Sequence, residues 1–231
     1  MERKRCLVII PAYNEAGAIV GTVEDIKQNA RSFDYVIIND CSTDATGQLC
    51  EEHGYNVVKL PVNSGIGAAV QTGYMYAARY GYDYAIQVDG DGQHDARFLE
   101  YMAEYIEKEG VNMLIGSRFL EKEGFQSTGL RRVGIRYFTW LIKCLTGETI
   151  TDPTSGMRMV DRAVIEFFAR EYPKDYPEPE TVTQILKMGM KVKEIPVEMK
   201  ERQSGVSSIN MKRSVYYMIK VSLACLMAAL M

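Results

Sequence analysis

The chain has 231 residues, of which 47% are hydrophobic and 25% charged, enough for one large globular domain, alone or with a short extension. Its formal net charge of −3 excludes the basic surface typical of a nucleic-acid-binding protein. Five scattered cysteines without a C-x-x-C pair indicate reduced thiols in a cytosolic compartment and exclude a disulfide framework or a zinc site.

Apolar runs and glycine-terminated helical patterns alternate along the first half of the chain. The first apolar run is interrupted by Pro11, so it predicts a strand and is too short for a signal-peptide core. In chain order, the patterns predict strands over 6–12, 35–40, 55–60, 84–89 and 111–116, and helices over 18–30, 44–53, 65–80 and 96–109.

Continuous apolar strands between helices predict an α/β fold, with a mainly parallel sheet covered on both faces. Ligands of such sheets bind outside the carboxyl ends of the strands. Four predicted strand ends carry polar groups, and these are the segments 11–15, 39–42, 89–91 and 116–118.

The stretch "VDGDGQ" places Asp89, Asp91 and Gln93 at a spacing of two residues, directly after a predicted strand. In an extended chain these side chains face one point, and two carboxylates that close repel each other. A hard cation such as Mg²⁺ or Mn²⁺ would remove this conflict. The alternative is a plain turn, which also favours Asp and Gly.

No G-x-G-x-x-G follows the first strand, which argues against the dinucleotide-binding fingerprint. The stretch "NSGIGAA" (63–69) offers a glycine-rich helix start. Such a start either receives a phosphate or only makes a tight connection between strand and helix.

Taken together, "VIIPAYNE", "VIINDCSTDAT", "NSGIGAA", "VDGDGQH" and "GSRF" resemble the family 2 glycosyltransferases, over about residues 6–210. The resemblance implies a GT-A fold, a nucleotide-sugar donor linked to UDP or GDP, and Mg²⁺ or Mn²⁺. Asp89 and Asp91 then correspond to ligands of the metal and the diphosphate, and Gln93 to a further metal ligand, as in the dolichyl-phosphate mannose synthase branch. The remaining donor-binding positions implied are Pro11, Ala12, Tyr13, Glu15, Asp40, Gly67 and Gly90.

The second half resembles the same branch, because "DPTSGMR" (152–158) and "KERQSGVSSI" (200–209) are similar to motifs of polyprenyl-phosphate glycosyltransferases. On this basis Arg118, Arg131 and Arg202 are expected to receive the acceptor phosphate or the donor diphosphate. Arginine suits this role because its planar fork matches phosphate oxygens.

Residues 129–147 predict an amphipathic helix with a stripe containing Arg132, Arg136 and Lys143 and a broad apolar, aromatic face. This pattern favours an interfacial helix on a membrane over an ordinary surface helix. From Ser214 the chain is apolar except for Lys220. We therefore expect a catalytic domain over 1–210 and an apolar helix over 211–231, which either packs on the domain or begins a membrane-associated extension.

The segment "DYPEPETV" (175–182) departs from the E-D pair that supplies the base in many inverting members of the family. It offers Glu178 and Glu180, of which Glu180 occupies the position where the lipid-phosphate branch tends to carry an acid. The two prolines predict an extended, stiff segment. The carboxylate would act as a base, position the sugar, or cap the following helix.

The expected function is a metal-dependent inverting glycosyltransferase that moves a sugar from a nucleotide-diphosphate sugar to a polyprenyl phosphate, at the cytoplasmic face of the cell membrane. One alternative is transfer to a saccharide hydroxyl in cell-surface polysaccharide synthesis, and another is a catalytically silent nucleotide-sugar-binding module. A membrane partner protein and self-association both stay open.

Overall fold

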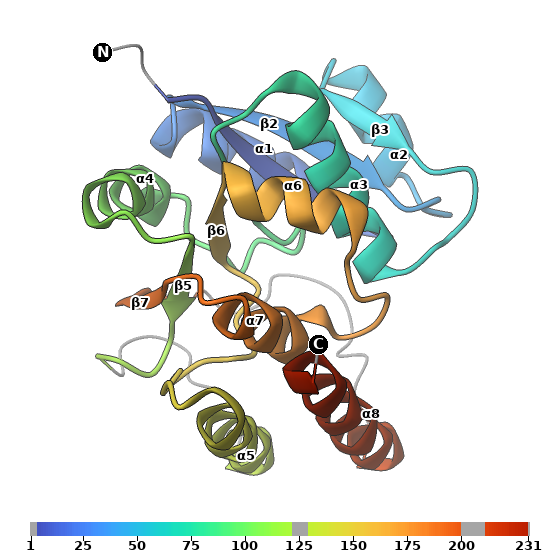
Figure 1. Ribbon diagram of the computed structural model, residues 1–231. Helices are drawn as coiled ribbons and strands as arrows, with labels where there is room; N and C mark the ends of the chain where they lie inside the picture. Colours follow the sequence, from blue (N-terminus) through green and yellow to red (C-terminus); the bar gives the residue numbers. More distant parts are fainter. Residues whose placement is uncertain (1–3, 122–128, 200–210, 231) are drawn as a thin grey trace.

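The computed structural model describes residues 4–121, 129–199 and 211–230. Strands and helices alternate along most of the chain, and Figure 1 shows them as a sheet with helices on both sides. The elements are β1 (Cys6–Ala12), α1 (Ile19–Asn29), β2 (Phe33–Asn39), α2 (Thr46–Glu52), β3 (Val57–Lys59), α3 (Ile66–Tyr80), β4 (Tyr84–Gln87), α4 (Arg97–Glu109), β5 (Met113–Ser117), α5 (Gly129–Thr146), β6 (Arg158–Asp161), α6 (Arg162–Arg170), α7 (Pro177–Lys187), β7 (Val192–Pro196) and α8 (Met211–Leu230).

The seven strands form one sheet in the order β3-β2-β1-β4-β6-β5-β7. β1 pairs in parallel with both β2 and β4, and β5 pairs in parallel with β7. Only β6 runs antiparallel to its neighbours β4 and β5. The sheet is therefore mainly parallel, and the predicted α/β fold class is confirmed.

Strand β1 is buried on both faces, as its continuous apolar run predicts. Val8 and Ile10 lie in one core cluster with residues of α1 and α4. Leu7 and Ile9 lie in a second cluster with residues of α3, α6 and α7. This alternation follows from the two-residue period of a strand, and it places one helical layer on each face of the sheet.

Two predicted helix ends are confirmed at glycines. Gly81 after α3 and Gly110 after α4 adopt the left-handed conformation, with φ of 70° and 58°. Glycine reaches this region without steric cost, so it can end a helix with its backbone groups satisfied. Helix α3 thereby delivers the chain into β4, the strand that leads to the paired aspartates.

The segment 175–182 was expected to be extended, and this prediction was wrong. Helix α7 begins at Pro177, after Tyr176 in the left-handed conformation with φ of 51°. Proline is tolerated in the first helical turn because those N–H groups have no partner within the helix. Strands β6 and β7 and helix α6 were not predicted at all.

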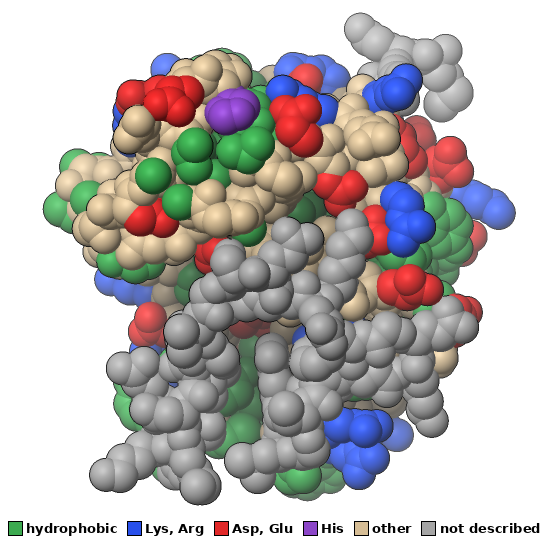
Figure 2. Space-filling model, turned by 180° about the vertical axis from the view of Figure 1, so that it is seen from behind, with side chains coloured by type: hydrophobic (Ala, Val, Ile, Leu, Met, Phe, Trp, Pro, Cys, Tyr) green, Lys and Arg blue, Asp and Glu red, His purple; other side chains and the backbone are tan. Residues whose placement is uncertain are grey.

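Helices α5 and α8 lie beside each other below the sheet in Figure 1. They pack through Phe138, Leu141, Val221 and Cys225, which are buried. Large apolar side chains remain exposed on both helices: Val133, Trp140, Tyr216, Ile219, Leu223, Leu226, Met227 and Leu230. Basic side chains gather at the α5 end of the molecule in Figure 2, where Arg132 and Arg136 are exposed. Among the described residues, no helix combines the length and the hydropathy that crossing a bilayer would require.

Candidate active site

The loop between β4 and α4, residues 88–96, carries the paired aspartates and is named the aspartate loop. Asp89 is partly exposed, and its Oδ1 accepts a hydrogen bond of 2.8 Å from the buried Gln87 amide. Asp91 is buried, and its Oδ1 accepts the backbone N–H of Gln93 at 3.0 Å. Gly92, between Asp91 and Gln93, has φ of 76°, a backbone conformation that favours glycine. The backbone of this loop is thus shaped by the carboxylates themselves.

His94 supports this loop from below. The ring is buried, and its Nδ1 accepts the backbone N–H of Asp89 at 3.0 Å. Because Nδ1 is an acceptor, the proton of the neutral ring lies on Nε2, 3.9 Å from Asp89 Oδ2. His94 therefore orients Asp89 through its main chain.

The carboxyl end of β1 lies against the same loop. A Cβ built on Gly90 would stand 3.2 Å from Pro11 O and 3.6 Å from both Ala12 Cβ and Glu15 Cγ. Tyr13, next in the chain, is 46% exposed. The structure thus brings together five positions, from two strand ends, that the sequence analysis assigned to donor binding.

Asp40, at the end of β2, is buried and organises the start of α3. Its Oδ1 and Oδ2 accept the backbone N–H groups of Ser64 and Gly65, at 2.7 and 2.9 Å. Its own N–H donates to Ala12 O at 2.9 Å. Asp40 therefore lies beside the donor positions of β1. Both of its carboxylate oxygens, however, accept hydrogen bonds from the backbone of the loop that precedes α3.

Gly67 has a packing role in the structure. Its N–H donates to Lys174 O at 3.2 Å, and a Cβ at this position would stand 2.1 Å from Pro173 O. The backbone of 173–174 thus occupies the space beside this helix start. The expected contact between Gly67 and a phosphate has no support in this geometry, and Gly67 is left out of the donor site proposed below.

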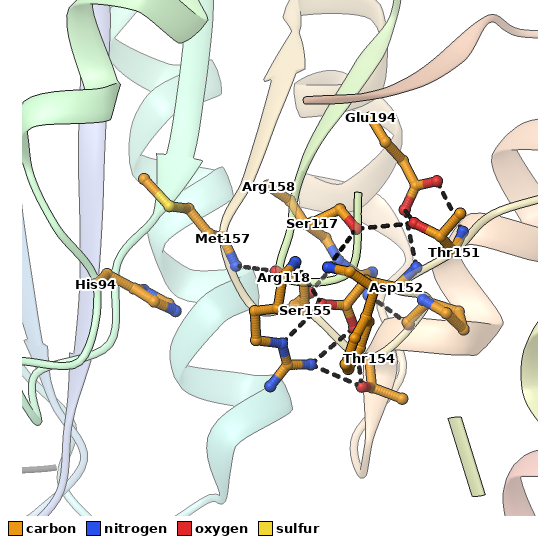
Figure 3. A network of polar contacts seen from close by, with 12 residues as sticks. His94, Ser117, Arg118, Thr151, Asp152, Thr154, Ser155, Met157, Arg158 and Glu194 are labelled. Atoms are coloured by element: carbon orange, nitrogen blue, oxygen red, sulfur yellow. Dashed lines mark hydrogen bonds and ion pairs between the residues drawn. The ribbon is translucent and has the colours of Figure 1, made fainter. Parts of the chain in front are cut away.

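The loop 152–156 carries a buried ion pair with Arg118 at the end of β5 (Figure 3). Arg118 Nε donates to Asp152 Oδ2 and Nη2 donates to Asp152 Oδ1, both at 2.7 Å. Nη2 also donates to Thr154 Oγ1 at 3.0 Å. The Arg118 charge is therefore already balanced by a carboxylate, which limits its expected role as a phosphate receptor.

Glu194 on β7 holds the same loop from the other side (Figure 3). Its carboxylate accepts the N–H and the hydroxyl of Thr151 and the N–H of Asp152, at 2.7, 3.0 and 2.8 Å. Burial raises the pKa of Glu194, while these donors lower it. Sequence analysis did not single out Glu194, because the strand β7 that carries it was not predicted.

Loop 152–156 lies directly on the aspartate loop. A Cβ at Gly156 would stand 3.2 Å from Asp89 Oδ2, 3.4 Å from Gln87 Nε2 and 3.5 Å from His94 Cε1. Any larger residue here would crowd the carboxylate of Asp89. The motif "DPTSGMR" therefore forms one wall of the site that contains Asp89.

The remaining predicted arginines are not placed. Arg202 and the side chain of Arg131 lie outside the described residues. Arg131 belongs to α5, and this helix borders a largely apolar cavity of about 250 Å³ with two other arginines in its wall. The cavity is lined by Phe119, Arg132, Ile135, Arg136, Thr139 and Thr151.

Glu180 lies in the first turn of α7, on the side of α8. Burial raises its pKa, the neighbouring Glu171 raises it further, and Lys220 of α8 lowers it. Lys220 also pairs with Asp175. The charges that act on Glu180 thus belong to Glu171, directly after α6, and to α8, and not to the aspartate loop.

The donor set of the aspartate loop fits a hard divalent cation. Asp89 and Asp91 supply carboxylate oxygens and Gln93 an amide oxygen, the ligand types preferred by Mg²⁺ and Mn²⁺. No cluster of three His, Cys, Asp or Glu suited to a metal occurs within residues 4–121, 129–199 and 211–230. A cation here would therefore share its coordination with a diphosphate or water.

Comparison with known proteins finds two relatives that match most of the chain. The chain is 28% identical over 229 residues to polyprenol monophosphomannose synthase from Mycolicibacterium smegmatis, covering 95% of this chain and 86% of the relative. It is 25% identical over 220 residues to undecaprenyl-phosphate mannosyltransferase from Micrococcus luteus, covering 89% and 88%.

Among solved structures, the fold matches glucosyl-3-phosphoglycerate synthase from Mycobacterium tuberculosis in complex with Mn²⁺, UDP-glucose and phosphoglyceric acid. The TM-score is 0.73 at 17% identity, covering 98% of this chain and 79% of that one. At this identity the match supports the GT-A fold alone. The model of the family named "Glycosyl transferase family 2" matches residues 7–168, and the chain therefore belongs to this family and is a glycosyltransferase.

Proposed function

We propose that this chain is a metal-dependent inverting enzyme that transfers a sugar from a UDP- or GDP-linked donor to a polyprenyl phosphate, at the cytoplasmic face of the cell membrane. The observation that carries the proposal is the contact of two loops. The aspartate loop, similar to the donor site of the family, lies directly under Gly156 of the loop 152–156, which is similar to a polyprenyl-phosphate motif.

On the donor side, Asp89, Asp91 and Gln93 would hold the cation, and the positions around Pro11 and Tyr13 the nucleoside. When bound, the cation offsets the negative charge that develops on the departing diphosphate. The exposed ring of Tyr13 is available to stack on a base, and the buried Asp40 fixes the loop beside it.

On the acceptor side, a lipid phosphate does not require a general base. Its second pKa is about 6, so at pH 7 it is largely dianionic and already nucleophilic. An oxygen of this phosphate attacks the anomeric carbon from the face opposite the diphosphate, and the bond to the diphosphate oxygen breaks. The task of the protein is to hold two anions close together. Arg131 and Arg202 are proposed for this task, with a smaller contribution from Arg118, whose charge Asp152 already balances.

The membrane side of the proposal is supported by α5 and α8. Exposed apolar side chains and the basic Arg132 and Arg136 lie on these two helices, and apolar area combined with basic charge favours an anionic bilayer surface. The names of the two relatives, a polyprenol monophosphomannose synthase and an undecaprenyl-phosphate mannosyltransferase, support the same acceptor class.

The test is release of nucleoside diphosphate from a panel of UDP- and GDP-linked sugars with Mn²⁺, with and without undecaprenyl phosphate. We expect one donor to turn over only when the lipid phosphate is present, and EDTA to abolish this turnover. Equal turnover with an oligosaccharide acceptor in place of the lipid would favour the hydroxyl-acceptor alternative. Nucleotide-sugar binding without turnover on any acceptor would favour the silent module.

A further inference from the structure

Helix α7 presents two carboxylates in its first turn, Glu178 and Glu180. Residues two apart on an α-helix project about 200° apart, so these side chains leave nearly opposite faces of the helix. The two carboxylates therefore cannot serve the same site, and the surroundings of each face decide which one is directed at the donor.

The face that contains Glu180 packs toward α8. Thr183, three residues further on, hydrogen-bonds Cys225 of α8, whose pKa is raised to about 11 by burial and by the charge of Glu180. Lys220 of α8 acts on Glu180 in turn. This carboxylate belongs to the contact between α7 and α8.

The face that contains Glu178 is held by Arg158. Arg158 Nη1 donates to Glu178 O and to Thr181 Oγ1, both at 2.7 Å. Val182 and Ile185, on the same side, belong to the core cluster that α7 shares with the sheet. Glu178 therefore leaves α7 on the side of the sheet and of the loop that precedes β6.

Arg158 joins α7 to that loop. Its Nε donates to Ser155 O at 2.7 Å and its Nη2 to Pro153 O at 2.9 Å, and the residue is only 3% exposed. Its four hydrogen bonds go to carbonyls and one hydroxyl, and no ion pair of Arg158 occurs within the described residues. These four hydrogen bonds offset the cost of burying the guanidinium, and they tie the first turn of α7 to the loop 152–156.

The charges of Asp89 and Glu178 both act on the hydroxyl group of Tyr172, a residue that follows α6 in the chain. Burial first, and then Tyr74, raise the pKa of Tyr172 well above its ordinary value. The negative charges of Glu178 and Asp89 raise it further, whereas Arg158 lowers it. Both carboxylates therefore lie near enough to Tyr172 for their charges to reach its hydroxyl group.

We propose that Glu178, and not Glu180, is the α7 carboxylate that contacts the donor sugar, and that Arg158 is the positioning residue that holds the first turn of α7, and with it Glu178, against the loop 152–156. The proposal rests on the proposed function, because it requires a nucleotide-sugar donor. Glu178 accepts hydrogen bonds from sugar hydroxyls, and such bonds to a charged group are the stronger kind.

The experiment compares Glu178→Gln with Glu180→Gln, which removes the same charge from the same helical turn. With the donor identified by the panel, we expect Glu178→Gln to lower kcat/KM by about tenfold to a hundredfold, the range of a lost hydrogen bond to a charged group. Affinity for the free nucleoside diphosphate with Mn²⁺ should stay unchanged, because that ligand lacks the sugar. Glu180→Gln should change kcat/KM by less than about threefold, under 1 kcal/mol.

Arg158→Lys tests the positioning role, because lysine keeps the charge and loses the planar fork. If Arg158 acts through Glu178, the double variant Arg158→Lys/Glu178→Gln should lose no more activity than Glu178→Gln alone. Losses that simply add would return Arg158 to a merely structural role.

The possible failures are distinct. A wild-type chain that turns over its donor but is weakened more by Glu180→Gln than by Glu178→Gln overturns the inference alone. The inference is also overturned if Glu178→Gln weakens the binding of free nucleoside diphosphate as much as it weakens the binding of the nucleotide sugar. A wild-type chain that binds no nucleotide sugar overturns the proposed function, and the inference with it.

Discussion

Arg118 and Asp152 form a buried, bidentate ion pair that links the end of β5 to the loop over the aspartates. Both side chains are nearly inaccessible, at 6% and 0% exposed, and the two N–O distances are both 2.7 Å. The N–H of Arg118 also donates to Asp152 Oδ2, at 3.2 Å. The pair fixes the position of the Arg118 guanidinium group. Because Asp152 already balances the charge of this group, the main contribution of Arg118 is to hold the loop in place.

Removing one partner of this pair should destabilise the fold. Arg118→Met leaves Asp152 as an unpaired buried carboxylate, a change that typically costs about 3–5 kcal/mol. We expect the double variant Arg118→Met/Asp152→Asn to recover part of that loss, because no uncompensated charge remains. Urea unfolding of the wild type, both single variants and the double variant measures the coupling. Single variants that each lose under about 1 kcal/mol would show that the pair is solvent-screened.

The paired aspartates should be needed for the donor and not for the fold. Asp89→Asn or Asp91→Asn removes a charged oxygen ligand, so we expect kcat/KM to fall by at least about a hundredfold, about 2.7 kcal/mol. The control is Asp34→Asn, which lies at the opposite end of the sheet, at the start of β2. Turnover that persists in EDTA, or an Asp91→Asn variant as active as the control, would contradict the metal site.

Much of the sheet could be predicted because its strands are buried on both faces. Cys6–Ala12 is apolar throughout and lies at the centre of the sheet, between β2 and β4, so its run and its bounds agree. Gly81 and Gly110 mark helix ends because they adopt the left-handed backbone conformation, which glycine reaches more readily than other residues. These are local signals, and a single sequence carries them.

The second half was harder to predict because its structure depends on contacts distant in sequence. Strand β6 is four residues long and runs antiparallel between two others, an arrangement with no local pattern. The prolines around Glu178 are compatible with extended chain and with the first turn of a helix alike. The helical turn is held by Arg158, which donates hydrogen bonds to the carbonyl oxygens of Glu178, Ser155 and Pro153. Glu194 has meaning only through loop 151–152, which lies more than 40 residues earlier.

Glu180 should make stability depend on pH. Because burial raises its pKa, the folded chain binds this proton more tightly than the unfolded chain. The free energy of unfolding therefore falls as pH rises from the ordinary carboxyl value, about 4.3, through the raised pKa of the folded chain. Glu180→Gln should remove this part of the slope, so the variant gains relative to wild type as pH rises.

Urea unfolding between pH 4 and 7 measures the effect. The matched control is Glu109→Gln, an exposed carboxylate at the end of α4. A difference between Glu180→Gln and wild type that stays constant across this range would contradict the raised pKa.

Helices α5 and α8 should bind an anionic bilayer through side chains that the fold leaves unburied. Trp140 is 59% exposed on α5, and an aromatic ring on such a face belongs at a membrane interface. Arg136 is exposed on the same helix. A basic residue near an anionic surface contributes about 1 kcal/mol, so the charge reversal Arg136→Glu, a change of about 2 kcal/mol, should weaken binding by roughly thirtyfold at low salt.

Co-sedimentation with vesicles containing phosphatidylserine measures this, at low and at high salt. Trp140→Ala should lower the bound fraction at both salt concentrations, because the apolar contribution is not screened, whereas the effect of Arg136→Glu should shrink as salt shortens the Debye length. The control is Tyr101→Ala, an aromatic side chain that is 50% exposed on α4 and lies away from this surface. If Tyr101→Ala and Trp140→Ala reduce sedimentation equally, or the wild type does not sediment at low salt, then α5 is an ordinary surface helix. The lipid acceptor would in that case have to reach the aspartate loop without docking of this face.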